Sequence, residues 1–174
     1  RGVSIGRLSE AGGNQSVAIG TLADGASPYA LAIGTYATTA GSNNYSTAIA
    51  RSYASGADSF AAAIGNNTST YGATGAGSVA MGDIAKSTGS DGIAIGYNTL
   101  ATATRSAAFG SQAYALATRS VSLGQSRASG ADSFAAGIGT NNASYGSAHA
   151  YSVALGYQAV TSADYEIALG SSTA

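Results

Sequence analysis

A five-residue phrase returns along the whole chain, and its spacing restricts the possible folds more than any other feature. Ser16-Val17-Ala18-Ile19-Gly20 recurs in close form over residues 78–82, 120–124 and 152–156. A period of this kind predicts a stacked solenoid in which each copy forms one rung. Looser copies extend the series to twelve small anchoring residues, 14 to 17 positions apart: Gly6, Gly20, Gly34, Ala50, Gly65, Gly82, Gly96, Gly110, Gly124, Gly139, Gly156 and Gly170.

Before each anchor, apolar and small residues alternate. Apolar residues stand three and one positions upstream, as Val17 and Ile19 do, and a small residue such as Ala18 lies between them. Alternation of period two predicts a short strand. In the copies that end at Gly65 and Gly139, this alignment puts Ile64 and Ile138 one position upstream, with Ala62 and Ala136 three positions upstream. A second, weaker strand and a turn rich in Gly, Ser, Asn and Thr follow each anchor.

The small residue between the two apolar ones is never Lys, Glu or Gln. A strand face that is open to water normally carries polar side chains, so we expect a close neighbour against this face. We therefore predict that it packs on neighbouring chains and gives a symmetric oligomer. The alternative is that Ala is only a filler in an Ala-rich chain. The predicted trimer-interface residues are Ala18, Ala32, Ala48, Ala80, Ala94, Ala108, Ala154 and Ala168.

Composition limits the function classes that are open to this chain. Charged residues make up 9% of it, the net charge is −1, and the seven basic residues are scattered, which argues against nucleic-acid binding. No run approaches the roughly 18 apolar residues of a membrane span, so direct membrane insertion by this chain is not expected. Cys is absent, which excludes disulfides and agrees with an extracellular location.

We predict one domain over residues 1–174, because the repeats run from end to end. A longer repeat of 74 residues is superimposed, over about 51–124 and an incomplete 125–174. Residues 54–62 recur as 128–136, and Tyr71-Gly72 matches Tyr145-Gly146. The longest steps between anchors fall at the same rung of both copies, so we expect surface loops there, where recognition often resides.

The sequence contains few residues in arrangements that could carry out catalysis. The sole histidine, His149, stands where the other long repeat has Gly75, which favours surface variation over a catalytic base. Asp58 and Asp132 are isolated from one another by 74 residues, and an Asp that caps a turn explains them better than a calcium site. We therefore expect no catalytic residue, no cofactor and no metal, and no enzyme activity.

A column of residues five positions before each anchor mixes aromatic and charged side chains at the predicted corner of the rung. Tyr and Arg are enriched in binding hot spots, so this column and the long loops form the candidate ligand-binding surface. Stacked aromatics that merely stabilise adjacent rungs are an equal alternative, and they explain Phe60 and Phe134 better. The candidate residues are Tyr29, Tyr45, Tyr71, Arg105, Arg119, Tyr145, His149 and Tyr151.

The recurring Ser-Val-Ala-Ile-Gly phrase with its small-residue spacers resembles the YadA-like head repeats of trimeric autotransporter adhesins. The resemblance implies an all-β, left-handed parallel β-roll of about twelve rungs with two short strands per rung, assembled as a homotrimer. It also implies extracellular display on the bacterial outer membrane through a stalk and anchor that this chain does not include. The implied partners are extracellular matrix proteins, host cells or abiotic surfaces.

A trimeric phage tail fibre, or another appendage segment used for host recognition, remains the main alternative to an adhesin head. Ice binding would need flat columns of Thr, and the Thr clusters of this chain are isolated. A glycan-processing fibre enzyme would need paired carboxylates, and acidic residues are sparse.

Overall fold

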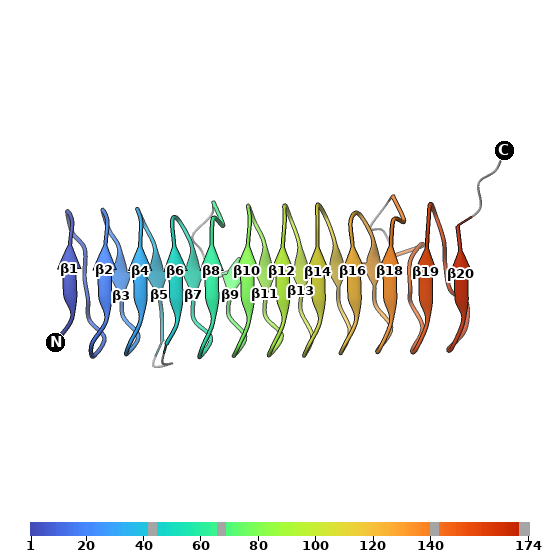
Figure 1. Ribbon diagram of the computed structural model, residues 1–174, viewed down its shortest axis with the longest axis horizontal. Coiled ribbons are helices and arrows are strands. Elements are labelled where there is room, and N and C mark those ends of the chain that lie inside the picture. Colours follow the sequence, from blue (N-terminus) through green and yellow to red (C-terminus); the bar gives the residue numbers. More distant parts are fainter. Residues whose placement is uncertain (42–44, 66–68, 140–142, 171–174) are drawn as a thin grey trace.

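The computed structural model describes residues 1–41, 45–65, 69–139 and 143–170. Every regular element in this part of the chain is a β-strand, and the strands wind into a parallel solenoid of about eleven turns (Figure 1). The predicted all-β roll with two short strands per rung is confirmed. Residues 42–44, 66–68 and 140–142, which belong to the predicted loops, lie outside the described residues.

The first sheet contains one three-residue strand from each rung, and all neighbours are parallel. Its register is that of the repeat, since Ala18 pairs with Ala32 and Ala80 with Ala94. The strands, in spatial order, are β1 (Val3–Ile5), β2 (Val17–Ile19), β4 (Leu31–Ile33), β6 (Thr47–Ile49), β8 (Phe60–Ala62), β10 (Val79–Met81), β12 (Ile93–Ile95), β14 (Ala107–Phe109), β16 (Val121–Leu123), β18 (Phe134–Ala136), β19 (Val153–Leu155) and β20 (Ile167–Leu169).

The second sheet lies opposite the first and consists of two-residue parallel strands. Isolated bridges extend it at both ends, from Glu10 to Asp24 and from Ala128 through Ser147. Its strands are β3 (Asp24–Gly25), β5 (Thr38–Thr39), β7 (Tyr53–Ala54), β9 (Gly72–Ala73), β11 (Lys86–Ser87), β13 (Leu100–Ala101), β15 (Tyr114–Ala115) and β17 (Arg127–Ala128).

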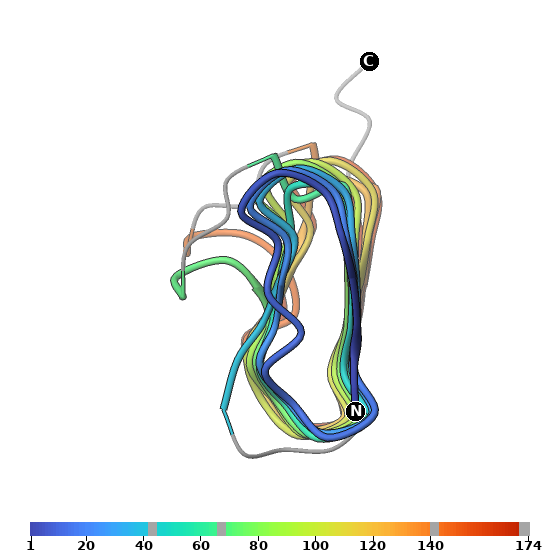
Figure 2. The same ribbon diagram turned by 90° about the vertical axis from the view of Figure 1, so that its left-hand side faces the viewer.

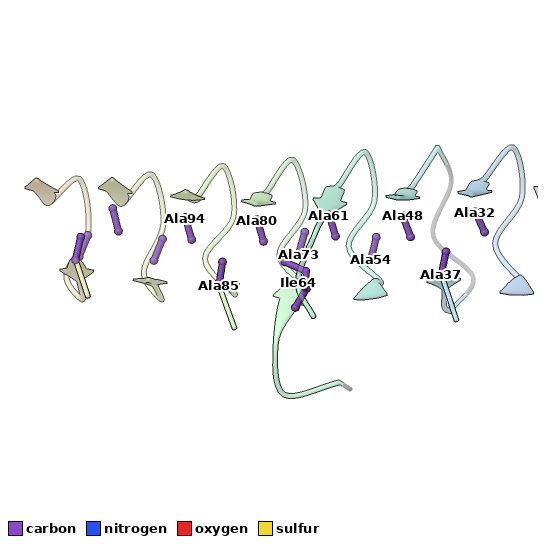
Figure 3. Close-up of a cluster of buried hydrophobic side chains, with 14 residues drawn as sticks. Ala32, Ala37, Ala48, Ala54, Ala61, Ile64, Ala73, Ala80, Ala85 and Ala94 are labelled. Carbon is purple, nitrogen blue, oxygen red and sulfur yellow. The ribbon is translucent and has the colours of Figure 1, made fainter. Parts of the chain in front are cut away.

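The core is a thin layer of small side chains between the two sheets. Figure 3 shows alanines of the first sheet, such as Ala80 and Ala94, pointing toward those of the second side of the roll, such as Ala73 and Ala85. All four are 0% exposed in the single chain. Small residues are required because the short rung leaves little space between the sheets, so a larger side chain would force them apart.

The predicted assignment of the two strand faces was therefore wrong. The alanines that were expected at a trimer interface lie inside the roll: seven of them are 0% exposed, and Ala168 is half-buried in the last described strand. A side chain without exposed surface in its own chain has no surface to offer to a neighbour. The absence of long polar side chains at this position reflects the core, and the apolar residues on either side face outward.

The serine that opens the repeated phrase closes the turn before several of the strands, although the buried hydroxyls of Ser46, Ser59 and Ser78 have no hydrogen-bond partner. Ser16, Ser106 and Ser120 are buried, and each hydroxyl donates to the carbonyl oxygen three residues earlier, at 2.7 to 2.8 Å. A buried hydroxyl costs free energy unless it is paired. The local hydrogen bond meets that demand and fixes the turn that leads into the strand.

In the regular rungs, the predicted anchoring glycines turn the corner after the strand of the first sheet. Gly20 has φ of +136°, and a Cβ there would overlap the carbonyl oxygen of Gly34 in the next rung. Few residues other than glycine adopt this conformation. Ala50, the predicted exception, has φ of +62°, which an L-residue tolerates at moderate cost.

The two long rungs differ from the predicted alignment. Strand β10 pairs Met81 with Ala62, so that Phe60 and Ala62 take the outward positions and Ala63 replaces the anchor. Ile64 then turns inward and is 0% exposed, and Ile138 does the same in the second copy. The chain leaves the roll after these isoleucines and returns at 72 and 146, and the described parts of both excursions project from the side of the second sheet (Figure 2).

Candidate functional site

An uncovered apolar strip runs the length of the first sheet. Each strand directs its first and third residues outward, and all but one of these 24 residues are apolar; Thr47 is the exception. In the middle rungs the exposed fractions are 36% for Ile33, 39% for Met81 and 37% for Leu123. Eleven steps of ~4.8 Å and a width of three residues give a strip of about 500 Å². This area is near the upper end of the largest apolar patches that soluble monomers expose, and such patches are often functional.

The second notable surface is a ridge at the corner before the first sheet. We call it the corner ridge, and it consists of residues five positions before each structural anchor that share a positive φ: Gln15, Tyr29, Tyr45, Asp58, Gly77, Asp91, Arg105, Arg119, Asp132, Tyr151 and Tyr165. Phe60 and Phe134, which the sequence alignment placed here, lie in strands β8 and β18 instead. Aspartates replace them on the ridge, because the anchors of these two rungs are Ala63 and Gly137.

Aromatic pairs occupy both ends of the corner ridge. Tyr29 and Tyr45 stack with ring centroids 5.0 Å apart, and Tyr151 and Tyr165 stack at 4.9 Å. These spacings match the separation of adjacent rungs, so each pair joins two turns of the roll. The rings still expose between 41% and 74% of their surface, which leaves broad apolar platforms open to a partner.

Charged pairs occupy the middle of the corner ridge. Nε and Nη2 of Arg119 donate to the two carboxylate oxygens of Asp132 at 2.5 and 2.7 Å, which is a bidentate pair. Arg105 lies 3.9 Å from the carboxylate of Asp91, and both side chains are about two-thirds exposed. Arg119 is thus bound within its own chain, whereas Arg105 is held loosely and is the freer cation of the two.

The loop residues of the candidate surface are less available than the ridge. Tyr71 and Tyr145 are half-buried and pack against the alanine core, where their chains re-enter the second sheet. Nδ1 of His149 lies 2.9 Å from the carbonyl oxygen of Thr161, and its side chain is also half-buried. Tyr71 and Tyr145 lie away from the corner ridge, whereas His149 stands two residues before Tyr151 in the same turn, so the structure separates the two loop tyrosines from the other six candidate residues.

Comparison with protein families decides what kind of repeat this is. The model of the YadA head domain repeat matches residues 1–23, 73–99, 101–126 and 150–173, which is more than half of the chain. The chain belongs to the YadA head family. No curated protein matches it.

Membership of the YadA head family identifies the chain as a structural domain of the adhesin type. The matched ranges include the first and last described strands of the roll and its regular middle rungs. The ranges leave out residues 24–72 and 127–149, where the steps of the repeat are least regular. The two long rungs, with their buried isoleucines, are therefore where this YadA head departs most from the family pattern.

The described part of this YadA head offers no enclosed site. It has no pocket, and no group of three or more His, Cys, Asp or Glu residues that could hold a metal ion. Nor does it contain a helix that is long and apolar enough to cross a membrane. Partial burial, with a smaller contribution from the negative charge of Glu10 on the neighbouring rung, raises the pKa of Asp24 above its ordinary 3.8.

The ion pair between Arg119 and Asp132 gives this YadA head a pH-dependent contribution to stability. The hydrogen bonds from Arg119 lower the pKa of the Asp132 carboxyl below its ordinary 3.8. A group with a lowered folded-state pKa stabilises the fold above its unfolded pKa and loses this contribution as the pH falls through the folded value. We expect Asp132→Asn to lower the melting temperature slightly at pH 7, and this difference from wild type to shrink between pH 4 and pH 2.

The control for the Asp132 experiment is Asp91→Asn, since the 3.9 Å pair is long and exposed and should contribute nothing measurable. Thermal melts of the three proteins between pH 7 and pH 2 test this. A gap between Asp132→Asn and wild type that stays constant down to pH 2 would show that the ion pair is not its source.

Sequence reasoning missed the three further members of the corner ridge that form side-chain pairs there. Tyr165 was not among the candidate residues although it completes a stacked pair, and the roles of Asp91 and Asp132 as arginine partners were not foreseen. Tyr165 and Asp91 could have been found from the sequence, because both stand five residues before a predicted anchor. Asp132 was hidden because the anchor of its rung was placed at Gly139 rather than at Gly137.

Proposed function

We propose that this chain forms the head of a homotrimeric, surface-displayed adhesin that attaches a bacterium to matrix proteins, host cells or abiotic surfaces. The observation that carries the proposal is the continuous apolar strip on the first sheet of a YadA-type roll. A thin core of small residues buries little surface per rung, so burial of the strip against other copies supplies stability that one chain lacks.

Assembly around a threefold axis fits the distribution of surfaces on the roll. Three first sheets that face the axis cover their apolar strips at once, and a closed ring leaves no strip exposed. The second sheets then face outward. Their outward residues are mixed in character, such as Lys86, Tyr114 and Arg127, as expected for a solvated face.

We assign the adhesive contacts to the corner ridge. Its stacked tyrosines present rigid aromatic area, and Arg105 adds a loosely held cation, which are the side-chain types enriched in binding hot spots. A trimer repeats the ridge three times, and many copies on one cell multiply weak contacts into firm attachment. In this proposal the chain is displayed on the bacterial surface as part of an autotransporter adhesin.

The adhesive role is tested by removal of the aromatic platforms. The variant Tyr29→Ser/Tyr45→Ser/Tyr151→Ser/Tyr165→Ser should attach at least tenfold more weakly to whichever surface wild type binds in a panel of immobilised matrix proteins, glycans and plastics. Its melting temperature should fall by only a few degrees, because each stacked pair contributes about 1 kcal/mol.

The matched control for this adhesion test is Tyr97→Ser/Tyr157→Ser, since these tyrosines are 52% and 63% exposed but lie just after the anchoring glycines, away from the corner ridge. The control should attach like wild type. Equal attachment of the fourfold variant and wild type would remove the ridge as the adhesive surface, and equal weakening in the control would show that the effect is not specific to the ridge.

A further inference from the structure

The apolar strip contains a size pattern that neither folding of one chain nor solubility demands. We call the first residues of the twelve strands of the first sheet the entry column and the third residues the exit column. The entry column is Val3, Val17, Leu31, Thr47, Phe60, Val79, Ile93, Ala107, Val121, Phe134, Val153 and Ile167. The exit column is Ile5, Ile19, Ile33, Ile49, Ala62, Met81, Ile95, Phe109, Leu123, Ala136, Leu155 and Leu169.

The combined size of the two outward side chains is nearly the same in every rung. Val17 and Ile19 have three and four side-chain heavy atoms, and Phe60 and Ala62 have seven and one. Each of the twelve pairs totals seven or eight. All three phenylalanines of the chain lie on this strip, and each shares its strand with an outward alanine.

The outer face of the second sheet lacks this regularity. Its outward residue ranges from Gly72, without a side chain, to Tyr114 and Arg127, each with large ones. Both faces belong to the same rungs and have the same spacing, so the solenoid itself does not impose constant size. Water does not impose it either, whereas a closely packed apolar partner does, because packed interiors tolerate exchanges that conserve volume.

The distribution of the phenylalanines indicates how the partner is aligned. Phe60 and Phe134 stand in the entry column, whereas Phe109 stands in the exit column. In a closed ring of parallel chains, each contact is between opposite edges of the strip, so the exit column of one chain meets the entry column of the next. Phe60 then faces Ala62 of its neighbour only when the two chains are at the same height.

We propose that the three Phe–Ala pairs fix the register of the assembly, so that copies of this chain associate parallel and without stagger. A slip by one rung would place Phe60 against Ile49 or Met81 of the next chain. These larger side chains would fill the space that Ala62 leaves open for Phe60 when the rungs are level. Rungs with Val, Ile or Leu in both columns do not distinguish between registers, so the Phe–Ala rungs carry this information. The proposal rests on the proposed trimer and adds how its chains are aligned.

An exchange of the two residues within one rung tests the register. The variant Phe60→Ala/Ala62→Phe moves the bulk from the entry to the exit column, as the native pair Ala107 and Phe109 already does. It should form trimers with itself. When it is refolded together with wild type, each mixed trimer contains one contact between two phenylalanines and one between two alanines, which combines overpacking with a void.

Native mass spectrometry of differently tagged chains measures the outcome. We expect the mixed trimers to be at least fivefold rarer than random mixing in the ratio 1:3:3:1 would give. The control exchange, Val121→Leu/Leu123→Val, alters the sizes by one carbon atom and should mix with wild type almost at random.

Three results of the exchange experiment decide between the proposals. Random mixing of wild type with Phe60→Ala/Ala62→Phe would overturn the register proposal and show that each phenylalanine merely covers the alanine of its own strand. Failure of that variant to assemble with itself, while the control exchange assembles, would overturn it as well. A wild-type chain that remains monomeric would instead overturn the proposed trimer.

Discussion

Ala94→Leu should destabilise the roll itself, with a fall in melting temperature of about 5 °C or more. Ala94 is 0% exposed and lies in the middle of the first sheet, between Ala80 and Ala108 of the adjacent rungs. Three added carbon atoms have no space between the two sheets, and overpacking of a close-packed core costs about 1 to 3 kcal/mol. Circular-dichroism melts at several protein concentrations measure the change.

The matched control for Ala94→Leu is Ile95→Leu, one residue further along the same strand but on the outward face. It conserves volume and should melt within about 2 °C of wild type. The contrary outcome is an Ala94→Leu protein that melts like wild type as a monomer but no longer associates. That result would mean that the alanines lie at the surface and contact a neighbouring chain, as the sequence pattern alone predicted.

Ile93→Asp/Ile95→Asp should dissociate the assembly while the roll remains folded. Both isoleucines face outward from β12 in the middle of the strip, and a trimer would bring six carboxylates together at its axis. Burial of unpaired charge costs several kcal/mol, so we expect association at least a thousandfold weaker. The control is Leu100→Asp in the same turn, on the outer face of the second sheet, which should associate like wild type.

Much of the fold follows from the period and the alternation of the repeat. The spacing of the anchors predicts the rungs, and the apolar-small-apolar pattern predicts the strands of the first sheet, which the structure has at the expected places in ten of the twelve rungs. The corner conformation also follows, because Gly20 occupies backbone space in which no side chain fits. These features are local, so that a single repeat already contains the information.

The inside and the outside of the roll do not follow from the alternation. A period of two separates Val17 and Ile19 from Ala18, but it does not state which set faces the core. Large apolar residues are usually buried, and this expectation fails for the strands because the facing strands leave space only for small side chains. The two buried isoleucines, Ile64 and Ile138, lie outside the strands, in the long rungs. The thickness of the core is a property of the closed rung and cannot be read from one strand.

The long rungs show why an anchor is not always the next glycine. Alignment on Gly65 placed Ile64 in the strand, whereas the ladder from β8 to β10 ends at Ala62 and the chain then buries Ile64. The alignment on Gly139 misplaced Ile138 in the same way, because the two copies of the 74-residue repeat share this sequence. On the corner ridge, the correct alignment would have replaced Phe134 by Asp132 and so revealed the partner of Arg119.

Sedimentation equilibrium of the wild-type chain and of Ile93→Asp/Ile95→Asp tests whether the outward strip of the first sheet joins the chains. We predict three times the 16.8 kDa chain mass for wild type and a single chain mass for the variant, with β-rich circular dichroism in both. A wild-type monomer, or a variant that remains as fully trimeric as wild type, would show that the strip does not join the chains.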